Sequence, residues 1–164
     1  MQDTRQESIE KLGELIKDVK TAMLTTMDWG VLRSRPMATQ DFEFDGDLWF
    51  FTSLETHKVE EIEKDRRVNL SYAAPDKNTY VSVTGSASIV KDQAKIDEYW
   101  SPINKAWFPE GKDDPNLVLL KVAVEQAEYW EYSSGVLVQA LSLVKALVTG
   151  ESGGAGGENK KIAF

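Results

Sequence analysis

Two short segments of the sequence carry side chains that could bind a phosphate group. Arg35 lies in Ser34-Arg35-Pro36-Met37, which has strand character, and Lys58 lies in Thr56-His57-Lys58, where a helix is expected to begin. A guanidinium presents a planar fork of donors that matches phosphate, and a helix start presents unpaired N–H groups. A lysine in the first turn opposes the helix dipole, and a bound anion would remove that conflict.

An aromatic strand, Leu48-Trp49-Phe50-Phe51-Thr52, lies between these two segments. Its rings suit a flat ligand, and Thr52 offers a hydroxyl. The combination favours a phosphorylated aromatic cofactor such as flavin mononucleotide (FMN). Each feature also has a plainer explanation: Arg35 could form a surface ion pair, Thr56 could cap the helix without a ligand, and Lys58 could be solvated. The order and spacing of the features together favour the ligand site.

Composition restricts the classes of function. The 164 residues suffice for one domain with a core, and 19 Lys and Arg against 27 Asp and Glu give a net charge of −8. This acidity argues against nucleic acid as a partner. The absence of cysteine and the single histidine, His57, exclude iron–sulfur clusters, thiol nucleophiles and zinc sites built on several histidines, so no metal site is expected. The sequence lacks an apolar signal region and a membrane-length apolar run, so we expect no membrane partner and a cytoplasmic location.

The hydrophobic periodicity predicts a mainly β (α+β) domain. We expect helices over residues 4–19, 57–64, 92–100 and 136–148, and strands over 22–27, 31–40, 48–52, 67–74, 79–90 and 116–132. Short connections indicate antiparallel pairing, so the pattern predicts a small six-stranded antiparallel barrel with peripheral helices. Residues 1–150 are expected to form this single domain. Residues 151–164 are expected to be a flexible glycine-rich tail that is dispensable for folding.

Two residues inside predicted strands indicate how those strands pair with their neighbours. Pro36 removes a ladder donor, which favours an edge strand or a bulge. Gly85 indicates a bulge or a close approach to the backbone. No Gly-x-Gly-x-x-Gly or Walker sequence supports a Rossmann or P-loop site.

Taken together, these segments resemble the flavin-binding split-barrel superfamily typified by pyridoxamine 5′-phosphate oxidase, and within it the general stress protein group. The resemblance covers about residues 9–132. It rests on residues 34–37, 48–52, 56–58, 80–85, 107–115, 117–120 and 128–130. It implies a six-stranded antiparallel split β-barrel, and a homodimer with the flavin at the subunit interface.

The resemblance also implies which residues contact FMN. They are Arg35, Pro36, Met37, Ala38, Thr39, Phe51, Thr52, Thr56, His57, Lys58, Tyr80 and Trp107. Residues 35–39 would follow the ring and ribityl chain, Phe51 and Thr52 would line them, and residues 56–58 would hold the phosphate. Tyr80 replaces a flavin-contacting glutamine of the oxidase. Trp107 could reach the flavin, for instance from the partner subunit, or could plug the barrel end as a loop aromatic.

The resemblance leaves the reaction open. No arginine follows Arg67, so the substrate-phosphate site of a true pyridoxamine phosphate oxidase is expected to be missing. One alternative is a flavin-dependent oxidoreductase with a general stress role, using a small-molecule substrate or a nicotinamide donor; no catalytic residue is assigned. The other is a non-catalytic flavin-binding, redox-sensing or flavin-storage protein. A heme is disfavoured by the single histidine, whereas a deazaflavin shares the phosphate and the flat ring.

Overall fold

A computed structural model describes residues 4–41, 43–132, 143–145, 147–150 and 157–164. Its helices are α1 (Arg5–Ile16), α2 (His57–Lys64) and α3 (Gln93–Tyr99), with short 3-10 helices η1 (Pro75–Lys77) and η2 (Pro102–Ala106). Its strands are β1 (Thr21–Asp28), β2 (Val31–Ala38), β3 (Asp47–Ser53), β4 (Arg67–Ala74), β5 (Thr79–Val90), β6 (Leu117–Glu131) and β7 (Glu158–Ala163). Of the predicted helix 136–148, residues 143–145 and 147–148 are helical and the rest lie outside the described residues.

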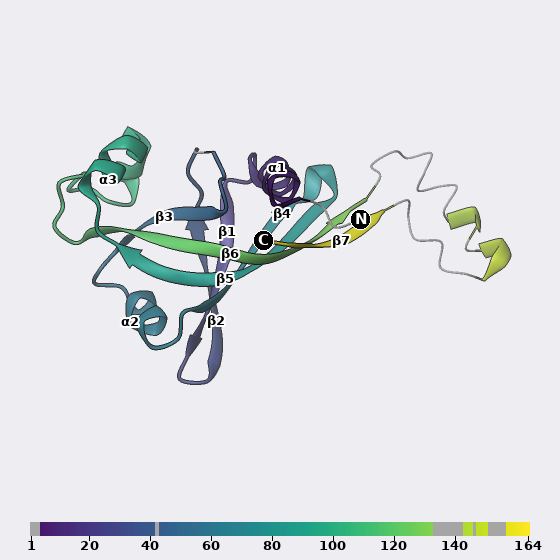
Figure 1. Ribbon diagram of the computed structural model, residues 1–164, viewed down its shortest axis with the longest axis horizontal. Coiled ribbons are helices and arrows are strands. Elements are labelled where there is room, and N and C mark those ends of the chain that lie inside the picture. The colour runs from purple at the N-terminus through teal and green to yellow at the C-terminus, as the bar shows by residue number, and fades with distance from the viewer. Residues whose placement is uncertain (1–3, 42, 133–142, 146, 151–156) are drawn as a thin grey trace.

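The strands form one antiparallel sheet in the order β2-β1-β4-β5-β6-β3 (Figure 1). The long strand β6 has two partners on one side: β3 pairs with its first half and β7 with its second half. The sheet curves into a half-barrel with α2 and α3 near one end and α1 above it. The split-barrel fold expected from the sequence is therefore confirmed.

Local sequence explains the hairpin that carries Arg35. The two residues between β1 and β2, Trp29 and Gly30, have φ of 50° and 83°, which is the geometry of a tight turn with positive φ at both positions. This turn fixes the register, so that Arg35 lies opposite Leu24 and Arg33 opposite Thr26. β2 is an edge strand of the sheet, as Pro36 predicts.

Gly85 permits β5 and β6 to approach each other. The register between them shifts at Thr84 and Gly85, and a Cβ placed on Gly85 would overlap the carbonyl oxygen of Ala123. The predicted bulge and close approach are both confirmed.

The core has two parts, separated by β3 and β6. The main cluster fills the half-barrel, with Leu24, Leu70 and Leu120 fully buried. The second cluster, which includes Phe51 and Ile96, lies on the other side of β3, where residues of α3 and the following loop pack against it. These two coverings explain why the residues of β3 are apolar on both faces.

The prediction of a flexible tail is wrong for residues 158–163, because these residues form β7 and pair with β6. Ile162 is buried in the main core, and the ring of Phe164 packs edge-on against Phe44 at 5.9 Å. The glycines at 153–157 suggested flexibility, but the residues after them alternate, and Ile162 and Phe164 share one face. Residues 151–156 lie outside the described residues.

Candidate anion site at the start of α2

The first turn of α2 leaves backbone N–H groups available to a ligand. Thr56 occupies the N-cap position, as predicted, but its side chain makes no capping hydrogen bond. Its hydroxyl instead donates to the carbonyl of Ser53 at 2.9 Å and accepts from Lys58 Nζ at 3.2 Å. The positive end of the helix is therefore not capped by its own threonine, and it favours an anion.

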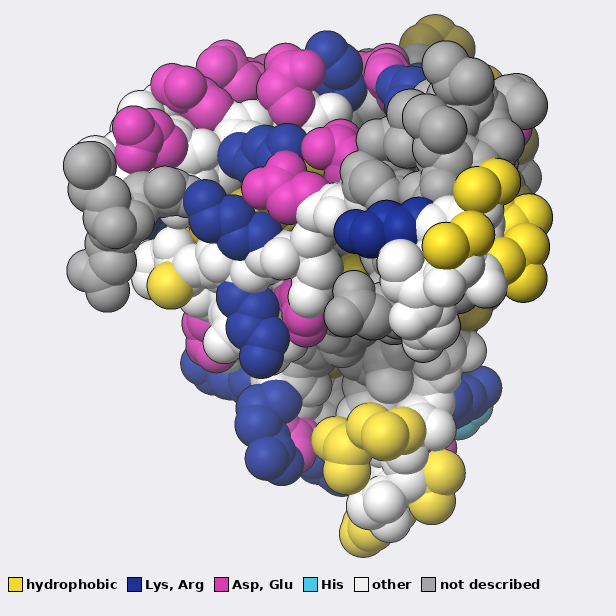
Figure 2. Space-filling view, turned by 90° about the vertical axis from the view of Figure 1, so that its right-hand side faces the viewer, with side chains coloured by type: hydrophobic (Ala, Val, Ile, Leu, Met, Phe, Trp, Pro, Cys, Tyr) yellow, Lys and Arg dark blue, Asp and Glu magenta, His cyan; other side chains and the backbone are white. Residues whose placement is uncertain are grey.

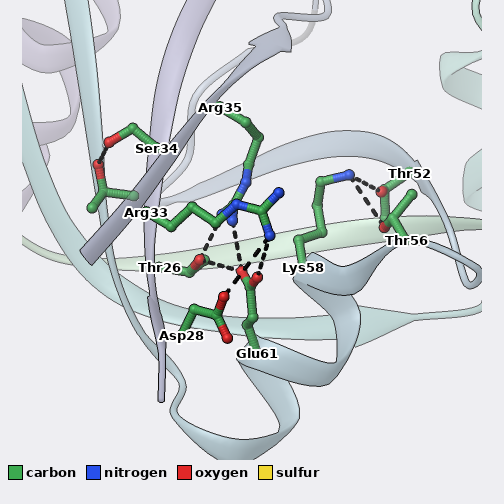
Figure 3. A network of polar contacts seen from close by, with 10 residues as sticks. Thr26, Asp28, Arg33, Ser34, Arg35, Thr52, Thr56, Lys58 and Glu61 are labelled. Atoms are coloured by element: carbon green, nitrogen blue, oxygen red, sulfur yellow. Dashed lines mark hydrogen bonds and ion pairs between the residues drawn. The ribbon is translucent and has the colours of Figure 1, made fainter. Parts of the chain in front are cut away.

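Lys58 is half-buried, and its hydrogen-bond acceptors among the described residues are neutral. Its ammonium donates to Thr52 Oγ1 at 3.1 Å and to Thr56 Oγ1 at 3.2 Å (Figure 3). Burial lowers the pKa of Lys58, and the nearby Arg35 guanidinium lowers it further, while Glu61 offsets part of this effect. A bound anion would relieve both the burial of the charge and its repulsion by Arg35.

Arg35 forms a closed set of contacts with Thr26 and Glu61 (Figure 3). Its Nη2 lies 2.6 Å from Glu61 Oε2 and its Nη1 lies 2.6 Å from Thr26 Oγ1, while the threonine hydroxyl donates to Glu61 Oε2 at 2.5 Å. The Arg35 and Glu61 side chains are only 16% and 5% exposed. The ion pair considered from the sequence thus exists, but its partner is buried.

Glu61 also forms an ion pair with a second arginine. Arg33 Nη1 lies 3.2 Å from Glu61 Oε1. Burial alone would raise the pKa of Glu61, but the hydrogen bond from Thr26 and the charges of Arg35 and Arg33 together hold the pKa below its usual value. Glu61 is therefore ionised at neutral pH.

The hairpin register points both arginines toward α2. Directly opposite residues of an antiparallel pair share a face, and the partners of Arg35 and Arg33 are the buried residues Leu24 and Thr26. Ser34 lies on the other face, where its hydroxyl is 2.6 Å from that of Thr25.

The site is locally positive on an acidic protein. Arg33, Arg35 and Lys58 surround a single buried carboxylate, Glu61, with Asp28 only at 3.9 Å from Arg33. Acidic side chains gather instead toward one end of the face shown in Figure 2. A cavity of about 630 Å³ lies between the β1–β2 hairpin and α2. Its wall includes Arg33, His57, Lys64 and Arg67 together with the carboxylates of Asp28, Glu60, Glu61 and Asp65, but not Lys58 or Arg35.

A larger hollow of about 1030 Å³ lies between α1 and the segment before β3. Of the predicted cofactor residues it includes only Thr39, and its wall carries Glu10, Glu14, Asp41 and Glu43 among others. Neither Lys58 nor Arg35 lines this hollow, so the proposed phosphate contacts lie outside it.

The remaining predicted contact residues do not gather around Lys58 within one chain. Met37 is buried in the main core, and the Thr39 hydroxyl donates to the carbonyl of Val19. Phe51 packs against the rings of Trp100 and Phe108 at 5.7 and 6.4 Å.

Four further predicted residues are exposed. Pro36 and Ala38 lie on the outer face of β2, whereas Tyr80 and Trp107 are 39% and 71% exposed. Trp107 therefore does not plug the barrel end.

Sequence reasoning missed Thr26, Arg33 and Glu61. The two-residue turn would have placed Arg33 opposite Thr26. Glu61 lies three residues after Lys58 and next to the buried Ile62, so helix periodicity places it near the same face. Among the described residues, no group of three or more His, Cys, Asp or Glu is arranged to hold a metal, and no helix is long and apolar enough to span a membrane.

Comparisons with known proteins agree with this architecture. A family model described as pyridoxamine 5′-phosphate oxidase like matches residues 7–153. General stress protein 26 of Bacillus subtilis is 35% identical over 125 residues, covering 74% of this chain and 86% of the relative. Protein bli-3 of Neurospora crassa is 29% identical over 156 residues, covering 88% and 75%.

Solved structures share the fold. The general stress FMN/FAD binding protein of Xanthomonas citri is 30% identical with a TM-score of 0.70, covering 80% of this chain and 93% of that chain. A general stress protein 26 from Jannaschia has a TM-score of 0.76 at 24% identity and covers 97% and 99%.

Proposed function

This chain belongs to the pyridoxamine 5′-phosphate oxidase-like family, and we propose that it binds FMN with the phosphate at the start of α2. The observation that carries the proposal is Lys58, a half-buried ammonium whose partners in the described part of the chain are hydroxyls. It is repelled by Arg35 and lies at an uncapped helix start. Each of these features is unfavourable alone and becomes favourable with a phosphate present.

The residues present fit a phosphate group. Lys58 and Arg35 would supply charge, Thr52 and Thr56 hydroxyls, and the first turn of α2 its backbone N–H groups. A half-buried cationic cluster also excludes water around the phosphate, which strengthens charge-assisted hydrogen bonds. The Xanthomonas citri neighbour is named as an FMN/FAD binding protein, which supports a flavin rather than another phosphorylated ring.

We further propose a flavin-dependent oxidoreductase with a role in general stress. The bound flavin would supply the redox chemistry, and the chain would supply position and electrostatics. General stress protein 26 of Bacillus subtilis supports the stress role. The lack of any arginine after Arg67 supports a substrate other than pyridoxamine 5′-phosphate.

A homodimer would complete the site. Strands β1, β4 and β5 alternate exposed residues with buried ones, and their exposed, outer face carries Met23, Ala73 and Tyr80. The adjoining hairpin, at the lower end of Figures 1 and 2, exposes Trp29 and Leu32 at 84% and 72%. A second copy on this face would cover the apolar surface, and by the resemblance the flavin would lie where the two copies meet.

Visible absorption of the purified protein tests the cofactor. We expect a flavin spectrum, or its appearance after addition of FMN and removal of excess ligand, and mass spectrometry identifies the bound molecule as FMN or a deazaflavin. Native protein that takes up neither would contradict the proposal. A steady-state assay with NADH or NADPH and an electron acceptor then separates an oxidoreductase from a protein that only binds or stores flavin.

A further inference from the structure

We propose that Glu61 is a positioning residue that orients Arg35 for the phosphate, an inference that rests on the proposed FMN site. In this proposal Glu61 makes no contact with the phosphate. It acts by holding one side of the guanidinium, so that the other N–H groups remain available to the anion.

The geometry of the cluster supports this role. Arg35 has five N–H groups, and two of them donate to described residues, one to Glu61 and one to Thr26. Thr26 donates in turn to the same Glu61 oxygen that Arg35 contacts. Because the three contacts close on one another and the side chains are largely buried, the plane of the guanidinium is fixed before any ligand arrives.

Charge alone does not explain a glutamate at this position. A buried carboxylate repels a phosphate, and it reduces the positive potential that Arg33, Arg35 and Lys58 create. A buried ion pair also gives little net stability compared with apolar residues of similar volume. Orientation of Arg35 is an effect of Glu61 that would favour the phosphate, because an anchored donor loses less conformational freedom on binding.

These two effects predict opposite results for Glu61→Gln. If Glu61 acted only through its charge, neutralising it would tighten FMN binding. If it positions Arg35, replacing a charge-assisted hydrogen bond by a neutral one loosens the guanidinium, and we expect FMN affinity to fall about fivefold or more.

The experiment titrates apoprotein with FMN and with riboflavin, which lacks the phosphate. Glu61→Gln should weaken FMN binding and leave riboflavin binding unchanged, a split that a general loss of structure would not give. Glu60→Gln is the matched control, because Glu60 is an exposed neighbour on α2 and loses the same charge. FMN affinity in Glu61→Gln equal to or tighter than in Glu60→Gln would overturn the inference.

Two further variants keep the test decisive. In an Arg35→Ala background, Glu61→Gln should cause no additional loss of FMN affinity, since Glu61 acts through Arg35; an equal loss in both backgrounds would overturn the inference. Thr26→Val removes the contacts of the Thr26 hydroxyl to Arg35 and Glu61 without a change in charge, and it leaves the Arg35–Glu61 pair in place. It serves if Glu61→Gln does not fold: we expect a smaller loss of FMN affinity than in Glu61→Gln, and FMN binding tighter than in wild type would overturn the proposal. Wild-type protein that binds no FMN contradicts both the proposed function and this inference, whereas normal wild-type binding with unaffected variants contradicts the inference alone.

Discussion

At the scale of single residues, the cations at the start of α2 are unfavourable for the stability of the free protein. A bound anion would make the same arrangement favourable. The partners of Lys58 within the described ranges are hydroxyls, and its pKa is lowered first by burial and then by Arg35. Arg35 differs, because Glu61 already balances its charge. Removal of Arg35 would leave a buried carboxylate without its closest cation, so Lys58 is the cleaner position at which to test phosphate binding.

We expect Lys58→Met to weaken FMN binding by about 1.5–3 kcal/mol, the usual contribution of a charge-assisted hydrogen bond. Isothermal titration calorimetry at neutral pH measures the change. Lys161→Met, on the exposed side of β7, removes the same charge at a distance and should leave FMN affinity unchanged. Equal FMN affinity in wild type and Lys58→Met would exclude Lys58 from the phosphate site.

The lowered pKa of Lys58 also predicts a pH dependence of stability. Its folded-state pKa lies below the unfolded value of 10.5, so between these two values the unfolded chain binds more protons and stability rises with pH. The stability of apoprotein relative to Lys58→Met should therefore increase as the pH climbs toward 10.5. Thermal unfolding at several pH values checks this. A difference in stability between wild type and Lys58→Met that does not change with pH would show that the ammonium is not destabilised in the folded state.

At the scale of secondary-structure elements, the hairpin register positions the arginines, and a glycine permits β5 and β6 to pair closely. The two-residue turn sets which residues of β1 face Arg33 and Arg35. The close pairing of β5 and β6 at Gly85 leaves no room for a side chain. A Cβ there would overlap the carbonyl oxygen of Ala123 and would lie 2.9 Å from Val122 Cγ1. By contrast, a Cβ at Gly13 in α1 would meet Phe44 at an ordinary 3.8 Å.

These two glycines therefore predict opposite effects of one substitution. Gly85→Ala should lower the free energy of unfolding by about 1–3 kcal/mol because of overpacking. Gly13→Ala should raise it by about 0.5–1 kcal/mol, since alanine restricts the unfolded chain and favours a helix. Urea denaturation compares both variants with wild type, and a Gly85→Ala variant as stable as wild type would contradict the close approach of β5 and β6.

The last strand is expected to be essential for stability. Ile162 is 4% exposed and packs in the main core, so Ile162→Ala should reduce the free energy of unfolding by about 2–5 kcal/mol. Lys161→Ala, on the exposed side of the same strand, is the control and should change it by less than about 0.5 kcal/mol. Equal stability of the two variants would mean that β7 does not belong to the sheet.

At the scale of the whole molecule, the outer face of the sheet is the surface on which a second copy would bind. Within the described residues, β1, β4 and β5 bury one face and expose the other. The second face of β3 is covered by the chain's own α3 and loop residues. Apolar residues on both faces of β3 are thus explained without a partner, and the outer face of β4 is the place to test for one.

Ala73→Arg places a long charged side chain on this outer face and should convert the proposed dimer to a monomer in sedimentation velocity. FMN retention should fall with it, because the flavin is proposed to lie at the interface. Gln6→Arg adds the same charge on the exposed part of α1 and should leave both properties intact. A wild-type protein that sediments as a monomer, or an Ala73→Arg variant that remains a dimer, would contradict the proposed assembly.

The sequence alone determined the elements from α1 to β6, because hydrophobic period, turns and caps are local. α2, β4 and β5 have the predicted bounds, and Asp92 caps α3 as its sequence suggested. The sequence also brought Thr52, Thr56 and Lys58 together, since all three lie within seven residues at one strand–helix junction.

Only the tertiary structure decided which partners these groups have. Glu61 lies 26 residues from Arg35 in the chain, and Ile162 reaches β6 from beyond the glycine-rich segment. Long-range pairings of this kind depend on how the sheet curves and on which strands become neighbours, and local periodicity carries no information about either.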